Sequence, residues 1–360
     1  MVVEGRGIVA WEVGAALAPE PLVIDPPGPG EVLVRIEASG VCHTDLHVRD
    51  GAIGTLPILL GHEGAGIVEA VGPGVPEPSV GDYVVLAWRA PCGTCRFCRV
   101  GLLHLCAASL NAAPRQHTPD GRFPTPILGI GTFATHCVVA AKQAVPMPRA
   151  VPPAQACLIG CGVMTGVGAV LNTAQVRPGS TVAVFGAGAV GTSVIQGARL
   201  ARASRIIAVD LEPRKLEWAR TFGATDTVNA SEGDPVEQIR ELTGGHGVNY
   251  AFEAVGQPGV LRQVLACRDL AGVATLIGVP GRGSTLELDL PRFFDLGGSL
   301  RVSWYGDCLP TRDFPLLADW YLKGDLLLDE LVTRRIALAE VDDAFGAMKR
   351  GETLRSVVML

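Results

Sequence analysis

Short runs of alternating apolar and polar residues dominate the first part of the chain. Valine and isoleucine occupy every second position of residues 31–38, which is the period of a β-strand with one buried face. Residues 66–71 and 82–86 are further β-rich runs, and turn residues separate them. Many short strands of this kind predict a barrel-like β domain. Residues 1–30 are rich in glycine and proline, and we assign no element to them.

The pattern changes after Pro178. An apolar run is followed by a glycine-rich turn, a stretch with helical spacing and a second buried run. We expect strands at 181–185, 205–209, 249–253 and 273–278, and helices at 189–202 and 258–267. Strands that alternate with helices predict a doubly wound parallel sheet. A last helix is expected at residues 338–350, with its apolar residues on one face.

The length and charge of the chain limit its architecture and partners. A chain of 360 residues is long for one core and suggests two domains. Charged residues make up 18%, below the usual share of roughly 25%, so we expect surface buried between domains or between subunits of a homodimer or homotetramer. The net charge of −6 argues against a nucleic-acid groove or an anionic membrane face.

The cysteines and the N-terminus indicate a cytoplasmic protein. Glu4 and Arg6 interrupt the N-terminus before any apolar run, so no signal peptide is expected. Residues 150–176 carry no charge, but their glutamines, asparagine, prolines and glycines favour a buried core segment over a membrane span. Ten cysteines in a reducing compartment point to metal ligands rather than disulfides.

Three residues have the chemistry of a catalytic zinc site. Cys42 and His62 offer a thiolate and an imidazole, which suit Zn²⁺. A catalytic zinc takes three protein ligands and keeps one open position, and Cys161 is the best candidate for the third ligand. Such an ion lowers the pKa of a hydroxyl group and polarises a carbonyl, which suits reversible alcohol oxidation.

Four further cysteines predict a second, structural zinc. Cys92, Cys95, Cys98 and Cys106 follow the spacing C-x2-C-x2-C-x7-C within one short loop. Four thiolates at this spacing can close a tetrahedral shell around the metal. The alternatives are a pair of disulfides or a nucleic-acid-binding zinc module, and the loop has little positive charge for the second of these.

The glycine-rich turn predicts a dinucleotide cofactor. Gly186, Gly188 and Gly191 form G-x-G-x-x-G between an expected strand and an expected helix, and Asp210 ends the next strand. The glycines permit close approach of a pyrophosphate, and Asp210 should accept hydrogen bonds from the adenosine ribose. No cation follows Asp210 directly, which favours NAD over NADP. The alternative is an ordinary strand-to-helix turn with chance glycines.

Polar residues beside the first zinc site suggest a route for the proton. Thr44 can accept it from the alcohol and His47 can deliver it to solvent. Asp45 is expected to hold a ring nitrogen of His62 and to fix its tautomer. Glu63 could approach the zinc or pair with Arg355. His47 could instead be a surface-loop histidine, Asp45 a solvated loop acid and Glu63 a purely structural acid.

The chain resembles the zinc-dependent medium-chain alcohol dehydrogenases, in particular the mycothiol-dependent formaldehyde dehydrogenases, also described as S-nitrosomycothiol reductases. The likeness covers essentially the whole chain and is carried by residues 41–45, 88–90, 160–164, 303–310 and 354–360. It implies an α/β fold with a GroES-like β-barrel catalytic domain at 1–162, a Rossmann NAD-binding domain at 163–304, and a return to the catalytic domain at 305–360. The zinc loop 92–106 belongs to the first of these.

The resemblance also implies roles for residues that their own chemistry does not settle. His43 and Arg355 match positions that contact the pyrophosphate, and a histidine there would make the weaker, pH-dependent contact. The remaining matches are Lys215 near the ribose, Trp88 in the substrate pocket, and Val279 and Tyr305 at the nicotinamide. Lys215 could equally be an exposed helix lysine, and Trp88 a core residue.

The sequence therefore predicts a zinc-dependent, NAD-dependent alcohol dehydrogenase that acts on a small alcohol or aldehyde. A narrower alternative is oxidation of the mycothiol–formaldehyde adduct or reduction of nitrosomycothiol, although no readable motif binds mycothiol. A zinc-free reductase would lack Cys42, His62 and Cys161. A non-enzymatic zinc protein would keep the cysteine quartet and need no dinucleotide fingerprint.

Overall fold

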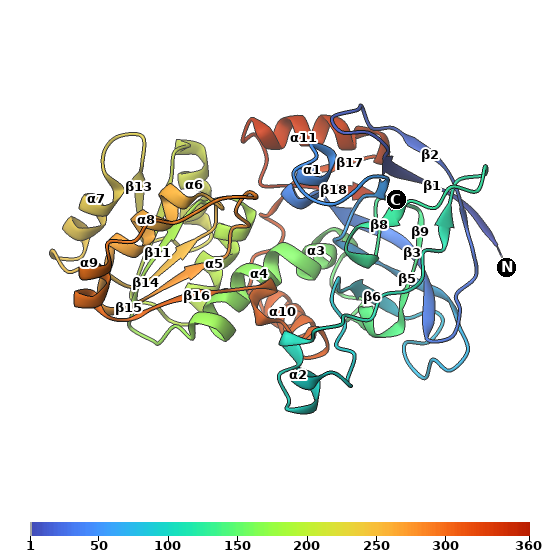
Figure 1. Cartoon of the computed structure of the whole chain (residues 1–360), viewed down its shortest axis with the longest axis horizontal. Coiled ribbons are helices and arrows are strands. Elements are labelled where there is room, and N and C mark those ends of the chain that lie inside the picture. The colour runs from blue at the N-terminus through green and yellow to red at the C-terminus, as the bar shows by residue number, and fades with distance from the viewer. Residues whose placement is uncertain (1) are drawn as a thin grey trace. The chain divides into compact units, whose positions relative to one another are not determined.

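The computed structural model describes residues 2–360, which divide into two compact units. One unit comprises residues 1–161 and 309–360, and the other comprises residues 162–308. The sequence analysis placed these boundaries after residues 162 and 304. Each unit has its own sheets and its own core (Figure 1).

The first unit is built from two sheets of mostly short strands. One sheet has the order β7 (Gln116–His117), β2 (Pro19–Ile24), β1 (Val3–Ala10), β4 (Ile58–Leu59) and β8 (Thr125–Pro126). The other has the order β10 (Ala144–Pro146), β6 (Tyr83–Leu86), β5 (Gly64–Val71), β3 (Glu31–Gly40), β18 (Arg355–Met359) and β17 (Val332–Ile336), with β9 (His136–Ala140) also paired to β3. The expected barrel-like β domain is therefore present.

Strand β3 organises the second sheet because it pairs with strands from three separate parts of the chain. Its apolar residues at alternate positions are buried, as the period of two predicts, and they form a core with residues of β5, β6 and β9. Strand β18 pairs antiparallel with the end of β3 at Gly40 and Val357. The last residues of the chain are thereby fixed beside the stretch that begins at Cys42.

Strands β1 and β2 lie in the glycine- and proline-rich residues 1–30, for which no element was predicted. The structure shows a reason for glycine in β1. A Cβ on Gly7 would lie 2.5 Å from the Leu22 side chain, and one on Gly5 would lie 2.4 Å from the Thr135 hydroxyl. These glycines permit close packing inside a strand.

The helices of the first unit are short. They are α1 (His43–Arg49), α2 (Arg96–Arg99), α3 (Pro153–Leu158), α10 (Pro310–Leu322) and α11 (Val341–Lys349), with 3-10 turns η1 (Leu103–Leu105), η2 (Ile127–Gly129), η3 (Ala141–Gln143) and η7 (Leu338–Glu340). The helix expected at 338–350 is present as η7 followed by α11, and its apolar residues are buried as expected. Helix α1 was not predicted.

The uncharged stretch around residue 160 forms one continuous helical segment. It runs through α3, the π-helical turn η4 (Ile159–Val163), α4 (Met164–Gly168) and a second π-helical turn, η5 (Ala169–Ala174). By length and composition the segment could cross a membrane, but 83% of its most apolar window is buried inside the protein. This agrees with the expected core segment.

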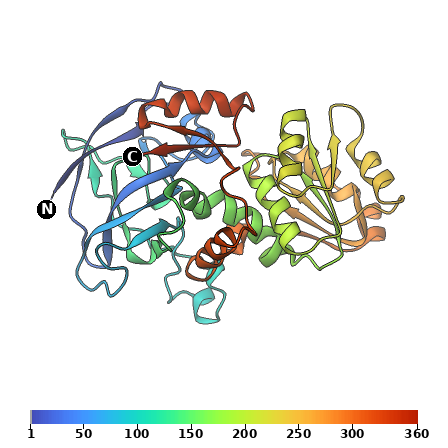
Figure 2. The same ribbon diagram turned by 180° about the vertical axis from the view of Figure 1, so that it is seen from behind.

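The second unit contains a parallel sheet in the order β13 (Asp226–Asn229), β12 (Arg205–Asp210), β11 (Thr181–Phe185), β14 (Val248–Glu253), β15 (Arg268–Leu276) and β16 (Ser299–Val302). The helices are α5 (Ala189–Leu200), α6 (Pro213–Thr221), α7 (Pro235–Leu242), α8 (Pro258–Ala266) and α9 (Leu290–Leu296), with the 3-10 turn η6 (Tyr305–Asp307). They cover both faces of the sheet (Figures 1 and 2). The strand order reverses direction between β11 and β14, so a crevice at their carboxyl ends is the expected ligand site.

Candidate active site

The structure brings the predicted catalytic zinc ligands together inside the first unit. One ligand atom each from Cys42, His62, Glu63 and Cys161 lies within 4.8 Å of the others. Cys42 precedes α1, His62 and Glu63 precede β5, and Cys161 lies in the π-helical turn η4. Residues distant in the sequence thus form a compact donor set of two thiols, one imidazole and one carboxylate.

The local fold of Cys161 suits a functional position. In a π-helical turn the hydrogen-bonding pattern widens, which displaces side chains from the regular α-helical positions, and such turns recur at functional sites. Gly160 lets the helix pack closely, because a Cβ there would lie 2.7 Å from the Leu86 carbonyl oxygen. The helix therefore approaches β6 closely and presents the Cys161 thiol to Cys42 and His62.

Asp45 lies behind His62, as the sequence predicted. Oδ2 of Asp45 is 3.1 Å from Nδ1 of His62, and both side chains are fully buried. Oδ1 of Asp45 accepts a hydrogen bond of 2.8 Å from the backbone N–H of Gly61. A carboxylate at this position favours a proton on Nδ1 and leaves Nε2 as the metal-facing nitrogen.

The chemistry of this cluster fits a bound cation. Within residues 2–360, His62 Nε2 and Glu63 Oε2 are buried atoms without a hydrogen-bond partner, which is costly unless a ligand satisfies them. A hydrogen bond with Cys161 and the neighbouring His62 ring hold the pKa of Cys42 well below its usual range. Burial opposes charge on His62, but Asp45 and Cys42 raise the His62 pKa well above its usual value. The site thus favours positive charge at its centre, as a zinc ion would supply.

Glu63 forms an ion pair with Arg355, one of the two roles left open by the sequence. Nη2 of Arg355 donates to Oε1 of Glu63, and Nη1 donates to the Val41 carbonyl at 2.9 Å. Burial raises the pKa of Glu63 to about 7, against the opposing effect of Arg355. Because the Arg355 side chain is buried and engaged in these contacts, its contact with a pyrophosphate stays a prediction.

Helix α1 carries the residues predicted for the proton route. Thr44 and His47 are three residues apart, so they lie on neighbouring positions of one helical face. His43 is on the same helix, with its ring centroid 6.4 Å from that of His47. The relay itself stays a prediction, because it depends on a bound substrate and cofactor.

The cysteine quartet has the geometry of a closed metal site. The sulfur atoms of Cys92, Cys95, Cys98 and Cys106 all lie within 4.8 Å of one another, and two of the separations are 4.0 Å. Zinc–sulfur bonds of about 2.3 Å in a tetrahedron place sulfur atoms roughly 3.8 Å apart. All cysteines of residues 2–360 are free thiols, which disfavours the disulfide alternative.

The loop also prepares its thiols for metal binding. The backbone N–H groups of Thr94 and Cys95 point at Cys92 Sγ, at 3.5 and 3.3 Å, and lower the pKa of Cys92 to about 6. The guanidinium of Arg89 donates to the Cys106 carbonyl beside these sulfurs. N–H donors thus favour the Cys92 thiolate, whereas burial raises the pKa of Cys98 to about 11, so the metal itself would have to displace that proton.

In the second unit the glycines have the conformation that a dinucleotide requires. Gly186 has a φ of +93°, and a Cβ on Gly191 would lie 1.7 Å from the Gly186 carbonyl oxygen. A Cβ on Gly188 would meet open space at the start of α5. The turn is therefore tight, and the first N–H groups of a helix are open to an anion, as a pyrophosphate requires.

Asp210 lies beside this turn. Its Oδ2 accepts a hydrogen bond of 2.8 Å from the Ala187 N–H, and its Oδ1 lies 3.8 Å from Lys215 Nζ. The acid at the end of β12 is thus tied to the turn at the end of β11, in the position expected for a ribose-binding carboxylate. Lys215 approaches the same carboxylate, and its contact with the ribose stays a prediction.

The other residues assigned by resemblance differ in accessibility. Val279 is 66% exposed, whereas Tyr305 is 3% exposed, so the Tyr305 side chain does not present a surface to a cofactor in this structure. Trp88 is partly buried and packs on the core of β3, β5 and β6, which favours the core alternative for this residue. Cys137, Cys157, Cys267 and Cys308 are buried, as expected for apolar thiols.

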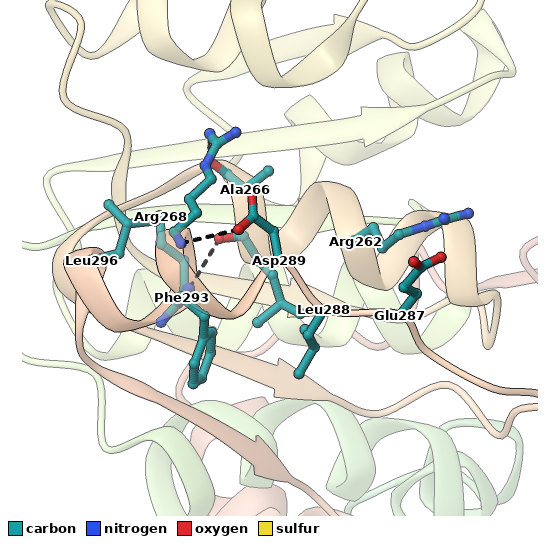
Figure 3. Close-up of a pocket in the computed structure, with 10 residues that line it drawn as sticks. Arg262, Ala266, Arg268, Glu287, Leu288, Asp289, Phe293 and Leu296 are labelled. Atoms are coloured by element: carbon teal, nitrogen blue, oxygen red, sulfur yellow. Dashed lines mark hydrogen bonds between the residues drawn. The ribbon is translucent and has the colours of Figure 1, made fainter.

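Figure 3 shows a pocket of the second unit whose lining contains none of the predicted site residues. It is bordered by α8, α9 and the start of β15, and its lining includes Arg262, Arg268 and Phe293. Arg268 donates to the carbonyls of Leu265 and Gly272, at 3.1 and 2.8 Å, and its guanidinium lies 5.1 Å from the Phe293 ring centroid. These contacts give Arg268 a structural role that joins α8 to β15.

Known proteins resemble the chain over its full length. Residues 28–149 match the alcohol dehydrogenase GroES-like domain family, and residues 189–323 match the zinc-binding dehydrogenase family. An S-(hydroxymethyl)glutathione dehydrogenase of Escherichia coli is 39% identical, with 99% of each chain covered.

Two crystal structures extend the likeness to the fold. An alcohol dehydrogenase zinc-binding domain protein from Burkholderia ambifaria is 37% identical, with a TM-score of 0.95 and 100% of each chain covered. Benzyl alcohol dehydrogenase from Acinetobacter calcoaceticus is 34% identical, with a TM-score of 0.93 and 99% of each chain covered. The predicted combination of a GroES-like domain and a Rossmann sheet is confirmed.

Proposed function

Since the chain belongs to the zinc-dependent medium-chain alcohol dehydrogenase family, we propose that it catalyses reversible hydride transfer between an alcohol and NAD. The observation that carries this proposal is the buried donor set of Cys42, His62 and Cys161, in which His62 Nε2 lacks a protein partner. The dinucleotide-binding turn of the second unit would hold NAD, the cofactor that exchanges hydride with the alcohol.

Zinc, when bound, supplies a Lewis acid that polarises a carbonyl and makes an alcohol more acidic. Cys42, His62 and Cys161 hold the ion. Asp45 orients His62 through Nδ1, and the Arg355 ion pair keeps Glu63 beside the cluster. A carboxylate oxygen of Glu63 lies within 4.8 Å of the ligand atoms that would hold the ion.

The protein must also move a proton and hold the cofactor. The Thr44 hydroxyl accepts the proton from the alcohol, and His47 passes it to solvent. Gly186, Gly188 and Gly191 admit the pyrophosphate of NAD to the N-terminus of α5, while Asp210 accepts hydrogen bonds from the adenosine ribose. Hydride transfer to the nicotinamide is the chemistry that NAD contributes.

A second candidate substrate is a thiol adduct of formaldehyde. The 39% identical relative from Escherichia coli is named for S-(hydroxymethyl)glutathione, whose hydroxymethyl group is chemically a primary alcohol. The resemblance found in the sequence suggests the mycothiol adduct, and reduction of nitrosomycothiol, as the corresponding reactions in this chain. The 34% identical benzyl alcohol dehydrogenase instead favours an aromatic alcohol.

The protein acts in the cytoplasm as a homodimer or homotetramer. Its free cysteines suit a reducing compartment. Strand β16 ends the parallel sheet, and Val302 and Trp304 at its end are exposed. An exposed sheet edge with apolar residues is suited to pairing with a second copy.

One set of measurements tests the proposal. Elemental analysis should give two zinc ions per chain, and NADH fluorescence should change on binding. Turnover with NAD⁺ is then measured on aliphatic and aromatic alcohols and on the hydroxymethyl adducts of glutathione and mycothiol. Zinc without NADH binding would indicate a non-enzymatic zinc protein, and NADH binding without zinc would indicate a zinc-free reductase. No turnover of any alcohol or adduct would refute the proposed reaction.

A further inference from the structure

Glu253 is a buried acid for which the proposed reaction has no role. It ends β14, where it is aligned with Phe185 at the end of β11 and with Leu276 at the end of β15. The side chain has no exposed surface, and within residues 2–360 no ion pair includes it. A buried carboxylate without a cation is costly, so its position needs an explanation.

The carboxylate holds the loop that follows β14. Oε1 of Glu253 accepts hydrogen bonds from the backbone N–H groups of Val255, Gly256 and Gln257, at 3.0, 2.8 and 3.3 Å. Bonds from N–H groups to a carboxylate are about twice as strong as bonds between neutral groups. Three such hydrogen bonds to one oxygen atom therefore fix the position of this loop, although part of the loop is exposed to solvent.

The backbone of Glu253 holds a second segment. Its carbonyl oxygen accepts from the N–H groups of Ile277 and Gly278, at 2.9 and 3.0 Å. The two segments touch closely, because a Cβ on Gly278 would lie 2.1 Å from the Gly256 nitrogen, and one on Gly256 would lie 2.6 Å from the Val279 carbonyl oxygen. One residue therefore connects the loops after β14 and β15.

These loops border the dinucleotide-binding turn. A Cβ on Gly186 would lie 2.8 Å from the Val255 side chain, and Val255 and Val279 are 48% and 66% exposed. Asp210 ends β12 on one side of β11, whereas Glu253 ends β14 on the other. A dinucleotide whose adenosine ribose is bound at Asp210 places its nicotinamide half on the β14 side of the crevice.

We propose that Glu253 is a positioning residue for the nicotinamide half of the cofactor. By holding the N–H groups of residues 255–257, its carboxylate fixes the apolar wall formed by Val255 and Val279. The inference rests on the proposed function, since it takes NAD to be the ligand of the second unit. It adds that the two halves of the cofactor depend on different acids, Asp210 and Glu253.

The test compares two ligands in Glu253→Gln, with Glu241→Gln, an exposed acid on α7, as the control. NADH has the nicotinamide ring, whereas ADP-ribose lacks it but keeps the adenosine and the pyrophosphate. Binding of NADH is measured by fluorescence and that of ADP-ribose by calorimetry. We expect Glu253→Gln to weaken NADH binding about tenfold, because the amide oxygen keeps the three N–H groups as neutral, weaker hydrogen bonds in place of charge-assisted ones, and to leave ADP-ribose binding unchanged.

Each outcome decides the inference. Selective loss of NADH affinity supports it, whereas equal loss for both ligands, or no loss for either, overturns it. Should Glu253→Gln not fold, Gly256→Ala displaces the same loop, since Gly256 has a φ of +86° and an added Cβ would meet Val279, and the same selective loss is expected. A wild-type protein that binds neither ligand would refute the proposed function rather than the role of Glu253.

Discussion

Arg355, in the last strand, forms a buried ion pair with Glu63, the residue that follows the predicted zinc ligand His62. Arg355→Met leaves the Glu63 carboxylate buried without its cation, and we expect a loss of about 3–5 kcal/mol in the free energy of unfolding. Urea denaturation of the wild type, the variant and the double variant with Glu63→Gln measures the coupling. The double variant should be more stable than Arg355→Met alone, and additive losses would show that the two side chains do not act as a pair.

The assignment of the catalytic ligands predicts the effect of Cys161→Ala. The donor set loses one of its two thiolates, so zinc content should fall from two ions per chain toward one and turnover should be abolished. NADH binding should survive because the dinucleotide-binding turn is unchanged. The control is Cys157→Ala, a buried thiol on the same helical segment, which should keep both ions. Full activity of Cys161→Ala would refute the assignment.

Cys98→Ser should have a different effect. The four-thiolate shell loses a ligand, so one zinc ion should be lost and thermal stability should fall, because binding energy at a structural zinc is folding energy. The measurements are elemental analysis and the melting temperature, with Cys137→Ala as a buried-thiol control. Loss of turnover at an unchanged melting temperature would argue against a structural role.

The proton route predicts unequal effects within α1. Thr44→Ala removes the group that accepts the alcohol proton, and we expect turnover to fall roughly 100-fold or more. His47→Gln should cost less, because water can partly replace it, and imidazole buffer should restore part of the rate. Should His47→Gln match the wild type in rate and pH profile, His47 is only a surface residue of the helix.

Asp210 predicts the choice of cofactor. Its carboxylate lies beside the dinucleotide-binding turn and would repel a 2′-phosphate, so kcat/KM should favour NAD⁺ over NADP⁺ by roughly 100-fold or more. Asp210→Gly should narrow this ratio, mainly through the KM for NAD⁺. The control Asp226→Asn changes an acid at the start of β13 and should keep the ratio. A wild-type preference for NADP⁺ would show that Asp210 does not face the ribose.

The sequence alone determined those features whose partners are close along the chain. Cys92, Cys95, Cys98 and Cys106 share one loop, so their spacing suffices to predict a closed metal site. Strands β11, β12, β14 and β15 overlap the short apolar runs that were predicted, whereas β13 and β16 are short and partly polar and were missed. The glycine fingerprint lies directly between a strand and a helix. The hydrophobic periodicity of short segments and the spacing of residues within one motif predict these features, and the structure shows them.

Only the tertiary structure decided the features that depend on distant residues. It showed that Arg355 forms an ion pair with Glu63, through the pairing of β18 with β3. It also showed strands in the glycine- and proline-rich N-terminal segment, where Gly5 and Gly7 permit close packing of β1. Glu253 could have been noticed as an acid that ends an apolar strand, just as Asp210 does. The loops that Glu253 holds became visible only in the folded chain, because hydrogen bonds to backbone N–H groups leave no side-chain pattern in a sequence.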